Sequence, residues 1–76
     1  MLLKPYLDAR GESYAHFARR CEQRADTIRA IALKGVRPRA DVAHAIITAS
    51  REEPAPDGGT VTLEDLGFPP QRESAA

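Results

Sequence analysis

A break in the apolar pattern of residues 18–35, ARRCEQRADTIRAIALKG, constrains this chain more than any other feature. An apolar stripe at helical spacing ends at Cys21, and Ala25 is the only apolar residue among the next five. A second stripe begins at Ile28 in a different phase. Because one continuous helix would keep a single phase, the pattern predicts two short helices joined by a turn near residues 22–24.

Helices are also predicted on both sides of this pair. Residues 2–11 place apolar side chains at i, i+3 and i+4, and Gly11 supplies the positive φ that commonly ends a helix. Ser13 is then a candidate N-cap for the next helix, on which His16, Arg19 and Arg20 are predicted to point away from the apolar stripe. A fourth helix is predicted from residue 38 or 39 to residue 50, since proline suits a first helical position.

The C-terminal part of the chain is predicted to be less regular. Residues 51–59, REEPAPDGG, are typical of a flexible loop. The alternation of Val61 and Leu63 predicts a strand of two or three residues. Thr62 and Asp65 have the spacing of a capping box, which predicts one turn of helix directly afterwards.

The chain is then expected to close its core and to end in a tail without structure. Leu66 and Phe68 are the apolar residues predicted to complete the core. Residues 69–76, PPQRESAA, are predicted to be disordered.

Composition excludes several classes of protein. A single cysteine excludes an internal disulfide framework and suits a reducing compartment, so a cytoplasmic location is expected. His16 and His44 have no metal-ligand spacing, and no metal or cofactor is expected. No apolar run approaches the roughly 18 residues of a membrane helix, and Lys4 and Pro5 interrupt any secretory signal. Catalysis is not expected, because the chain has no glycine-rich phosphate loop and no nucleophile with a suitably spaced base.

Charge is distributed unevenly although the formal net charge of the 76 residues is zero. Residues 1–39 hold nine lysines and arginines against four acids, whereas residues 40–76 hold two against seven. Such asymmetry indicates a basic binding face on the N-terminal half.

Five short motifs follow one another along residues 2–68: Phe17-Ala18, Ile28, KGVRP, DVAHAI and VTLEDL. Their order and spacing resemble the lambda-repressor and Cro-type helix-turn-helix regulators, in particular small prophage proteins of the Cro-like subgroup. The resemblance implies an all-α, lambda-repressor-like domain over residues 1–68, with four to five helices and a short C-terminal extended segment. The helix-turn-helix would span about residues 13–34. The implied function is a repressor of phage or mobile-element origin that binds a palindromic operator in double-stranded DNA as a homodimer.

Two residues depart from the pattern of these regulators. Glu22 stands where they usually have a glycine with positive φ, which costs a larger residue about 1 kcal/mol. Tyr14 stands where they usually have a glutamine that contacts phosphate, a role that Tyr14 itself or Gln23 can take over.

The helical wheel and the resemblance together assign the DNA contacts. Burial of Ile28, Ile31 and Ala32 turns the opposite face of their helix outward, and this face carries Asp26, Arg29, Ala30 and Leu33. The resemblance implies that this face enters the major groove. The candidates for reading bases are Asp26, Thr27, Arg29 and Ala30. The candidates for phosphate contacts, which position a protein without reading sequence, are Tyr14, Arg19, Arg20, Arg24, Lys34, Arg37 and Arg39.

Each base-reading candidate has its own chemistry. Arg29 suits bidentate pairing with guanine, which is worth about 1–3 kcal/mol of discrimination. Asp26 accepts hydrogen bonds, either from a cytosine amino group or from Arg29, its i+3 neighbour. Thr27 can reach a phosphate or a thymine methyl group, and Ala30 can pack on such a methyl group.

A protein-interaction module remains the alternative function. Leu33 faces outward and the C-terminal half is acidic. As an inhibitor or adaptor, the chain would bind a protein partner through these two features. A surface for homodimer formation is predicted on the fourth helix and on residues 61–68, because so short a chain has a marginal core of its own.

Overall fold

The computed structural model describes residues 1–68; the predicted tail lies outside the described residues. The elements are four α-helices and one 3₁₀ turn, and residues 1–68 contain no strand. In chain order they are α1 (Leu3–Arg10), α2 (Tyr14–Cys21), α3 (Ala25–Lys34), α4 (Ala40–Glu52) and η1 (Glu64–Leu66). The predicted all-α class is therefore confirmed.

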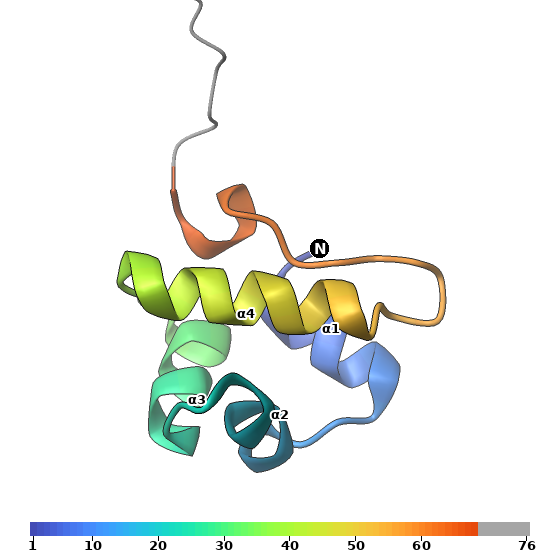
Figure 1. The fold of residues 1–76 in the computed structure, drawn as a ribbon, viewed down its shortest axis with the longest axis horizontal. Helices are drawn as coiled ribbons and strands as arrows, with labels where there is room; N and C mark the ends of the chain where they lie inside the picture. The colour runs from blue at the N-terminus through green and yellow to red at the C-terminus, as the bar shows by residue number, and fades with distance from the viewer. Residues whose placement is uncertain (69–76) are drawn as a thin grey trace, which may run out of the picture.

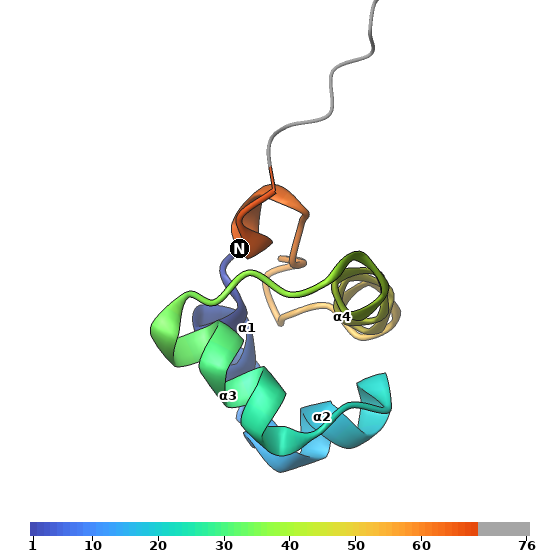
Figure 2. The same cartoon turned by 90° about the vertical axis from the view of Figure 1, so that its left-hand side faces the viewer.

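The helices are arranged around α4. Figure 1 shows α4 running across the molecule, with α2 and α3 on one side of it and the C-terminal segment on the other. In Figure 2 the molecule is viewed along α4, and α3 lies across the end of the molecule nearest the start of α4. α2 packs on both α3 and α4, and α1 packs on α3.

The turn predicted between the second and third helices is confirmed. α2 ends at Cys21 and α3 begins at Ala25, so three residues connect them. Ser13 is the N-cap of α2, where its hydroxyl accepts a hydrogen bond from the backbone N–H of His16 at 3.1 Å. Glu22 follows α2 with φ 59° and ψ 41°, the left-handed conformation expected at this position.

Replacement of Glu22 by glycine is expected to raise the free energy of unfolding by about 1 kcal/mol, because glycine adopts positive φ without the steric cost of a Cβ atom. Glu22 is the only non-glycine residue with positive φ in residues 1–68. Urea denaturation of E22G and wild type measures the difference. The matched control is Gln23→Gly in the same turn, where the substitution adds freedom to the unfolded chain, removes the hydrogen bond from the Gln23 amide to the carbonyl of Cys21 and lowers stability. Equal or reduced stability of E22G contradicts the prediction.

One core joins all the elements. The rings of Tyr6 and Phe17 are fully buried and meet edge to face, with centroids 5.8 Å apart. The hydroxyl of Tyr6 donates to the carbonyl oxygen of Glu53 at 2.6 Å, so its polar end is satisfied as well. The largest other side chains that are almost wholly buried are Leu7, Ile28, Ile46 and Val61.

The fourth helix starts later than predicted. Arg39 has φ −70° and ψ 163°, which is the extended backbone of an N-cap, and the helix begins at Ala40. Pro38 is buried in the link before the helix and does not occupy its first turn. The helix also continues past Ser50 to Glu52.

The predicted strand at Val61–Leu63 is wrong. The N–H of Val61 donates to the hydroxyl of Ser50 at 3.0 Å, and this hydroxyl in turn donates to the carbonyl of Ile47 at 2.9 Å. The next N–H, that of Thr62, donates to the Asp65 carboxylate at 3.0 Å. Side chains therefore accept the hydrogen bonds of these backbone N–H groups, and the segment pairs with no strand among the described residues.

The capping box predicted after this segment is confirmed. The N–H of Asp65 donates to the Thr62 hydroxyl at 3.3 Å, reciprocating the bond from the N–H of Thr62. The Asp65 carboxylate also accepts from the Met1 amino group at 2.7 Å, and that amino group donates to the Thr60 carbonyl at 2.9 Å. The C-terminal segment is thereby attached to the start of α1. Leu66 is buried and Phe68 is half-buried against the core.

None of the helices in residues 1–68 is both long enough and apolar enough to cross a membrane.

Candidate nucleic-acid interface

The outer face of α3 is the centre of the candidate interface. Ile28 and Ile31 are buried, and Asp26 and Arg29 are exposed on the opposite side. Leu33 continues this face with 51% of its surface exposed. The outward orientation predicted for these three residues is confirmed, whereas Ala30, which was also predicted to face outward, is half-buried.

A shallow groove runs beside this face. Thr27 and Ala30 are half-buried and line it from α3, whereas Val36, Arg37 and Arg39 line it from the link to α4. The groove thus brings together two predicted base-reading residues and two predicted phosphate contacts.

The lysines and arginines of residues 1–68 divide into those that form an ion pair and those that do not. Outside α3 and its flanking segments, several form short ion pairs: Lys4 with Asp8 at 2.8 Å, and Arg10 with Glu12 at 3.0 Å. Within residues 1–68, the cations on the α2–α3 turn, on α3 and at the start of the link to α4 form no ion pair. Arg19 of α2 forms none either. These cations, all exposed, are Arg19, Arg24, Arg29, Lys34 and Arg37; Arg51, near the end of α4, is likewise exposed and forms no ion pair within residues 1–68.

Two of the basic residues beside α3 have further contacts. The guanidinium of Arg37 lies over the ring of Phe68, 5.3 Å from its centroid, which holds the end of the described chain against the link. Arg39 forms an ion pair with Asp41 at 3.2 Å, but both side chains remain largely exposed. Such a surface pair is worth less than about 1 kcal/mol, so it does not prevent Arg39 from binding an anion.

Arg20 does not point away from the molecule as predicted. Its guanidinium lies over the Phe17 ring and donates to the Glu12 carboxylate at 2.7 Å and to the carbonyl of Ala49 at 2.6 Å. Its side chain is only 15% exposed. The prediction that Arg20 points outward is wrong, because the core face of α2 extends to its last turn and Glu12 attracts the cation inward.

Glu12 is the buried centre of this charge network. Its side chain is 3% exposed and accepts from Arg10, from Arg20 and from the Nδ1 atom of His16, which lies 2.6 Å away. Burial alone would raise the pKa of Glu12, but the hydrogen bonds from its three partners outweigh burial and hold the pKa below its ordinary value. Glu12 and its partners connect the α1–α2 loop with the end of α4.

Sequence reasoning did not single out Glu12. Its main partner, Arg20, is eight residues away, which is not a spacing that places side chains together on one helix.

Tyr14 and Asp26 have simpler surroundings. Tyr14 is half-buried at the first position of α2 and packs against the core. Asp26 forms no ion pair with Arg29 or any other described residue, so the predicted i+3 pair is absent. It lies in the first turn of α3, where a negative charge interacts favourably with the helix dipole.

Cys21 is a buried core residue at the end of α2. Burial raises the pKa of its thiol to about 11, so the group stays protonated and unreactive at neutral pH. Within residues 1–68, no group of three or more histidine, cysteine or acidic side chains is placed to hold a metal ion.

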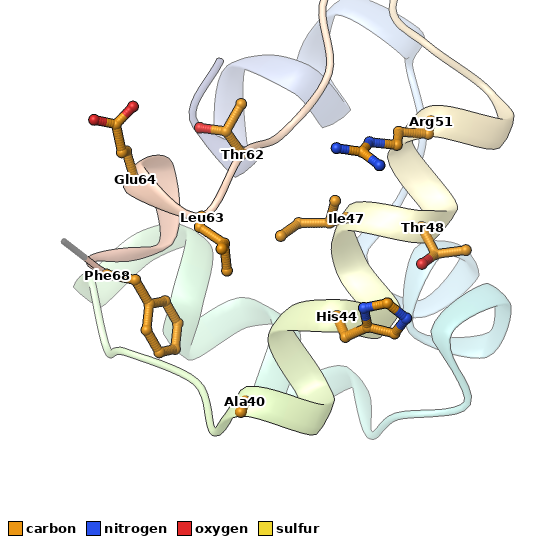
Figure 3. A pocket seen from close by; sticks show the side chains of 9 residues that line it. All are labelled: Ala40, His44, Ile47, Thr48, Arg51, Thr62, Leu63, Glu64 and Phe68. Atoms are coloured by element: carbon orange, nitrogen blue, oxygen red, sulfur yellow. The ribbon is translucent and has the colours of Figure 1, made fainter. Parts of the chain in front are cut away.

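A second, larger groove lies between α4 and the C-terminal segment, as Figure 3 shows. Ile47 and Leu63 face each other across it, and Phe68 closes one side. His44 and Arg51 lie on the α4 side. No residue of this groove was among the predicted DNA contacts, although residues 61–68 were assigned to a dimer surface.

Comparison of the chain with models of protein families, with curated proteins and with solved structures finds no match in any of the three. The chain is a small all-α domain in which two helices joined by a three-residue turn carry an exposed cationic face.

Proposed function

We propose that this chain is a sequence-specific DNA-binding regulator of the lambda-repressor and Cro-like helix-turn-helix class, which inserts α3 into the major groove. One observation carries the proposal: of the six exposed cations without ion pairs in residues 1–68, four lie on α3 and its two flanking segments, while Arg10 and Arg20 pair with buried Glu12. Cations exposed and without an internal partner are available to phosphates, which supply most of the affinity of such proteins for DNA.

The outer face of α3 supplies the base-reading groups of this proposal. Arg29 pairs with guanine O6 and N7, and Asp26 accepts from a cytosine amino group. Thr27 and Ala30, recessed in the groove beside α3, receive a thymine methyl group. The residues proposed for phosphate contacts are Arg19, Arg24, Lys34, Arg37 and Arg39. Arg20 is omitted because its guanidinium is bound within the protein.

A fluorescence-anisotropy titration tests the proposal. The DNA is the duplex selected most strongly by the protein from a random pool, and a scrambled duplex is the control. We expect binding that exceeds the control by ~10³ or more and weakens steeply between two salt concentrations, by roughly one counterion for each phosphate contact. Equal binding of both duplexes, or none, contradicts the proposal.

A protein-interaction module is the second candidate function. Leu33 and Val36, at the end of α3 and directly after it, are 51% and 50% exposed, which is unusual for two large apolar residues so close in sequence. An interface with a protein that rests on these residues would respond little to salt, unlike phosphate binding. The same titration series therefore distinguishes the two functions.

A further inference from the structure

Three guanidinium groups within residues 1–68 lie over aromatic rings. Arg10 lies over Tyr6, 5.8 Å from the centroid of its ring, and Arg20 lies over Phe17, 5.3 Å from the centroid. Both of these cations also pair with the buried carboxylate of Glu12. Their charges are therefore compensated within the protein, which suits a role in the fold.

Arg37 is the third of these cations, and its charge is not compensated. Its guanidinium lies 5.3 Å from the centroid of the Phe68 ring. The side chain of Arg37 is nevertheless exposed, and it forms no ion pair within residues 1–68. A cation over the face of a ring is held by the ring quadrupole, a contact that does not require its N–H donors. The ring thus restrains the guanidinium and leaves its N–H groups free to bind an anion.

The ring belongs to a C-terminal turn that is itself held in place. The N–H of Phe68 donates to the carbonyl of Leu63, and the N–H of Gly67 donates to the carbonyl of Glu64, both at 3.1 Å. The ring also packs against the core. A Cβ atom added to Gly67 would lie 3.7 Å from Cγ of Arg37, so the backbone of the turn lies beside the stem of this side chain. The turn therefore contacts both the stem and the charged end of Arg37.

We propose that Phe68 is a positioning residue of the DNA interface, which holds Arg37 in place to bind a phosphate. The inference rests on the proposed function, in which Arg37 is a phosphate contact. Arg37 lines the groove beside α3 together with Thr27 and Ala30, so the phosphate that it binds lies next to the bases that α3 reads. A long side chain loses rotamer freedom when it binds an anion. Because the ring already restrains Arg37 in the free protein, less freedom is lost on binding, and the C-terminal turn strengthens DNA binding without contacting DNA.

A double-mutant cycle, measured by anisotropy titration of the selected duplex, tests the inference. Phe68→Leu should weaken binding about 2- to 5-fold, because leucine keeps apolar packing but offers no aromatic face. Phe68→Tyr keeps the face and should bind like the wild type. In the Arg37→Gln background, Phe68→Leu should have no further effect, since the cation that the ring holds is absent. The matched control is the Lys34→Gln background, in which the loss should persist, because Lys34 lies over no ring within residues 1–68.

The cycle separates positioning from a merely structural role. If Phe68→Leu only loosens the fold, it weakens binding equally in the wild-type and Arg37→Gln backgrounds, and the inference is wrong. Unchanged binding by Phe68→Leu, or binding by Phe68→Tyr that is as weak as that of Phe68→Leu, overturns it as well. Circular dichroism of each variant verifies that it is folded. Failure of the proposed function gives a different result: the wild-type protein then binds both duplexes equally or neither, and this inference fails with it.

Discussion

Replacement of Glu12 by glutamine is expected to lower the free energy of unfolding by about 3 kcal/mol, the cost of removing one partner from a buried ion pair. The amide keeps the size of the side chain but leaves the guanidinium of Arg20, which is only 15% exposed, with no counter-charge closer than the exposed Glu53 carboxylate, 4.0 Å from its Nε atom. In a domain of this size the loss lowers Tm by roughly 10 to 20 °C. Thermal unfolding followed by circular dichroism measures it.

Glu52→Gln provides the matched control. Glu52 is an exposed carboxylate at the end of α4 and forms no ion pair within residues 1–68. We expect its replacement to change stability by less than about 0.5 kcal/mol. If E12Q and E52Q unfold alike, the network around Glu12 does not stabilise the fold.

The pH dependence of E12Q gives a second check on the same network. The pKa of Glu12 is lowered in the folded protein, so its contribution is complete above the unfolded value of about 4.3 and is lost as pH falls through the folded value. The stability difference between wild type and E12Q should therefore be constant from pH 7 to about 5 and should shrink as the pH falls below about 4. A difference that grows in acid contradicts this assignment.

Replacement of Arg29 by alanine is expected to weaken binding to the selected duplex by about 5- to 150-fold, which corresponds to 1–3 kcal/mol of lost base discrimination. Binding to the scrambled duplex should change much less. The side chain is exposed and forms no ion pair within residues 1–68, so the fold should be unaffected. Anisotropy titrations of both duplexes measure the ratio.

Lys34→Gln separates base reading from charge in the same assay. As a phosphate contact, Lys34 should contribute equally to both duplexes, and its loss should reduce the salt slope by about one. If R29A weakens both duplexes equally, as K34Q does, Arg29 acts as a phosphate contact and does not read a base.

Sequence reasoning predicted the features that local rules determine. The turn after Cys21, the N-cap at Ser13 and the capping box of Thr62 and Asp65 each depend on residues within four positions of one another, and all are present. The positive φ of Glu22 was expected from the resemblance, which places this residue where helix-turn-helix regulators usually have a glycine. Periodicity was sufficient because each element is short and has a clear apolar stripe.

Features that depend on distant contacts were not predictable in this way. Alternating apolar residues suggested a strand at Val61, but only the folded chain brings the hydroxyl of Ser50, eleven positions away, to its N–H. The position of Arg20 depends in the same manner on Glu12 and on the carbonyl of Ala49. The facing walls of the second groove belong to α4 and to a segment beyond a long loop, so no sequence pattern connects them.

The carbonyl groups at the end of α4 have a consequence for how the domain unfolds. They accept hydrogen bonds from Tyr6 and Arg10 of α1 and from Arg20 of α2, so side chains far away in sequence complete the last turn of this helix. The end of α4 is stable only while α1 and α2 are in place. We therefore expect a single cooperative transition, in which buried amide protons of α1 and of the last turn of α4 exchange with solvent at the same rate. A chain shortened to α2–α4 would lose this helix end and should not fold.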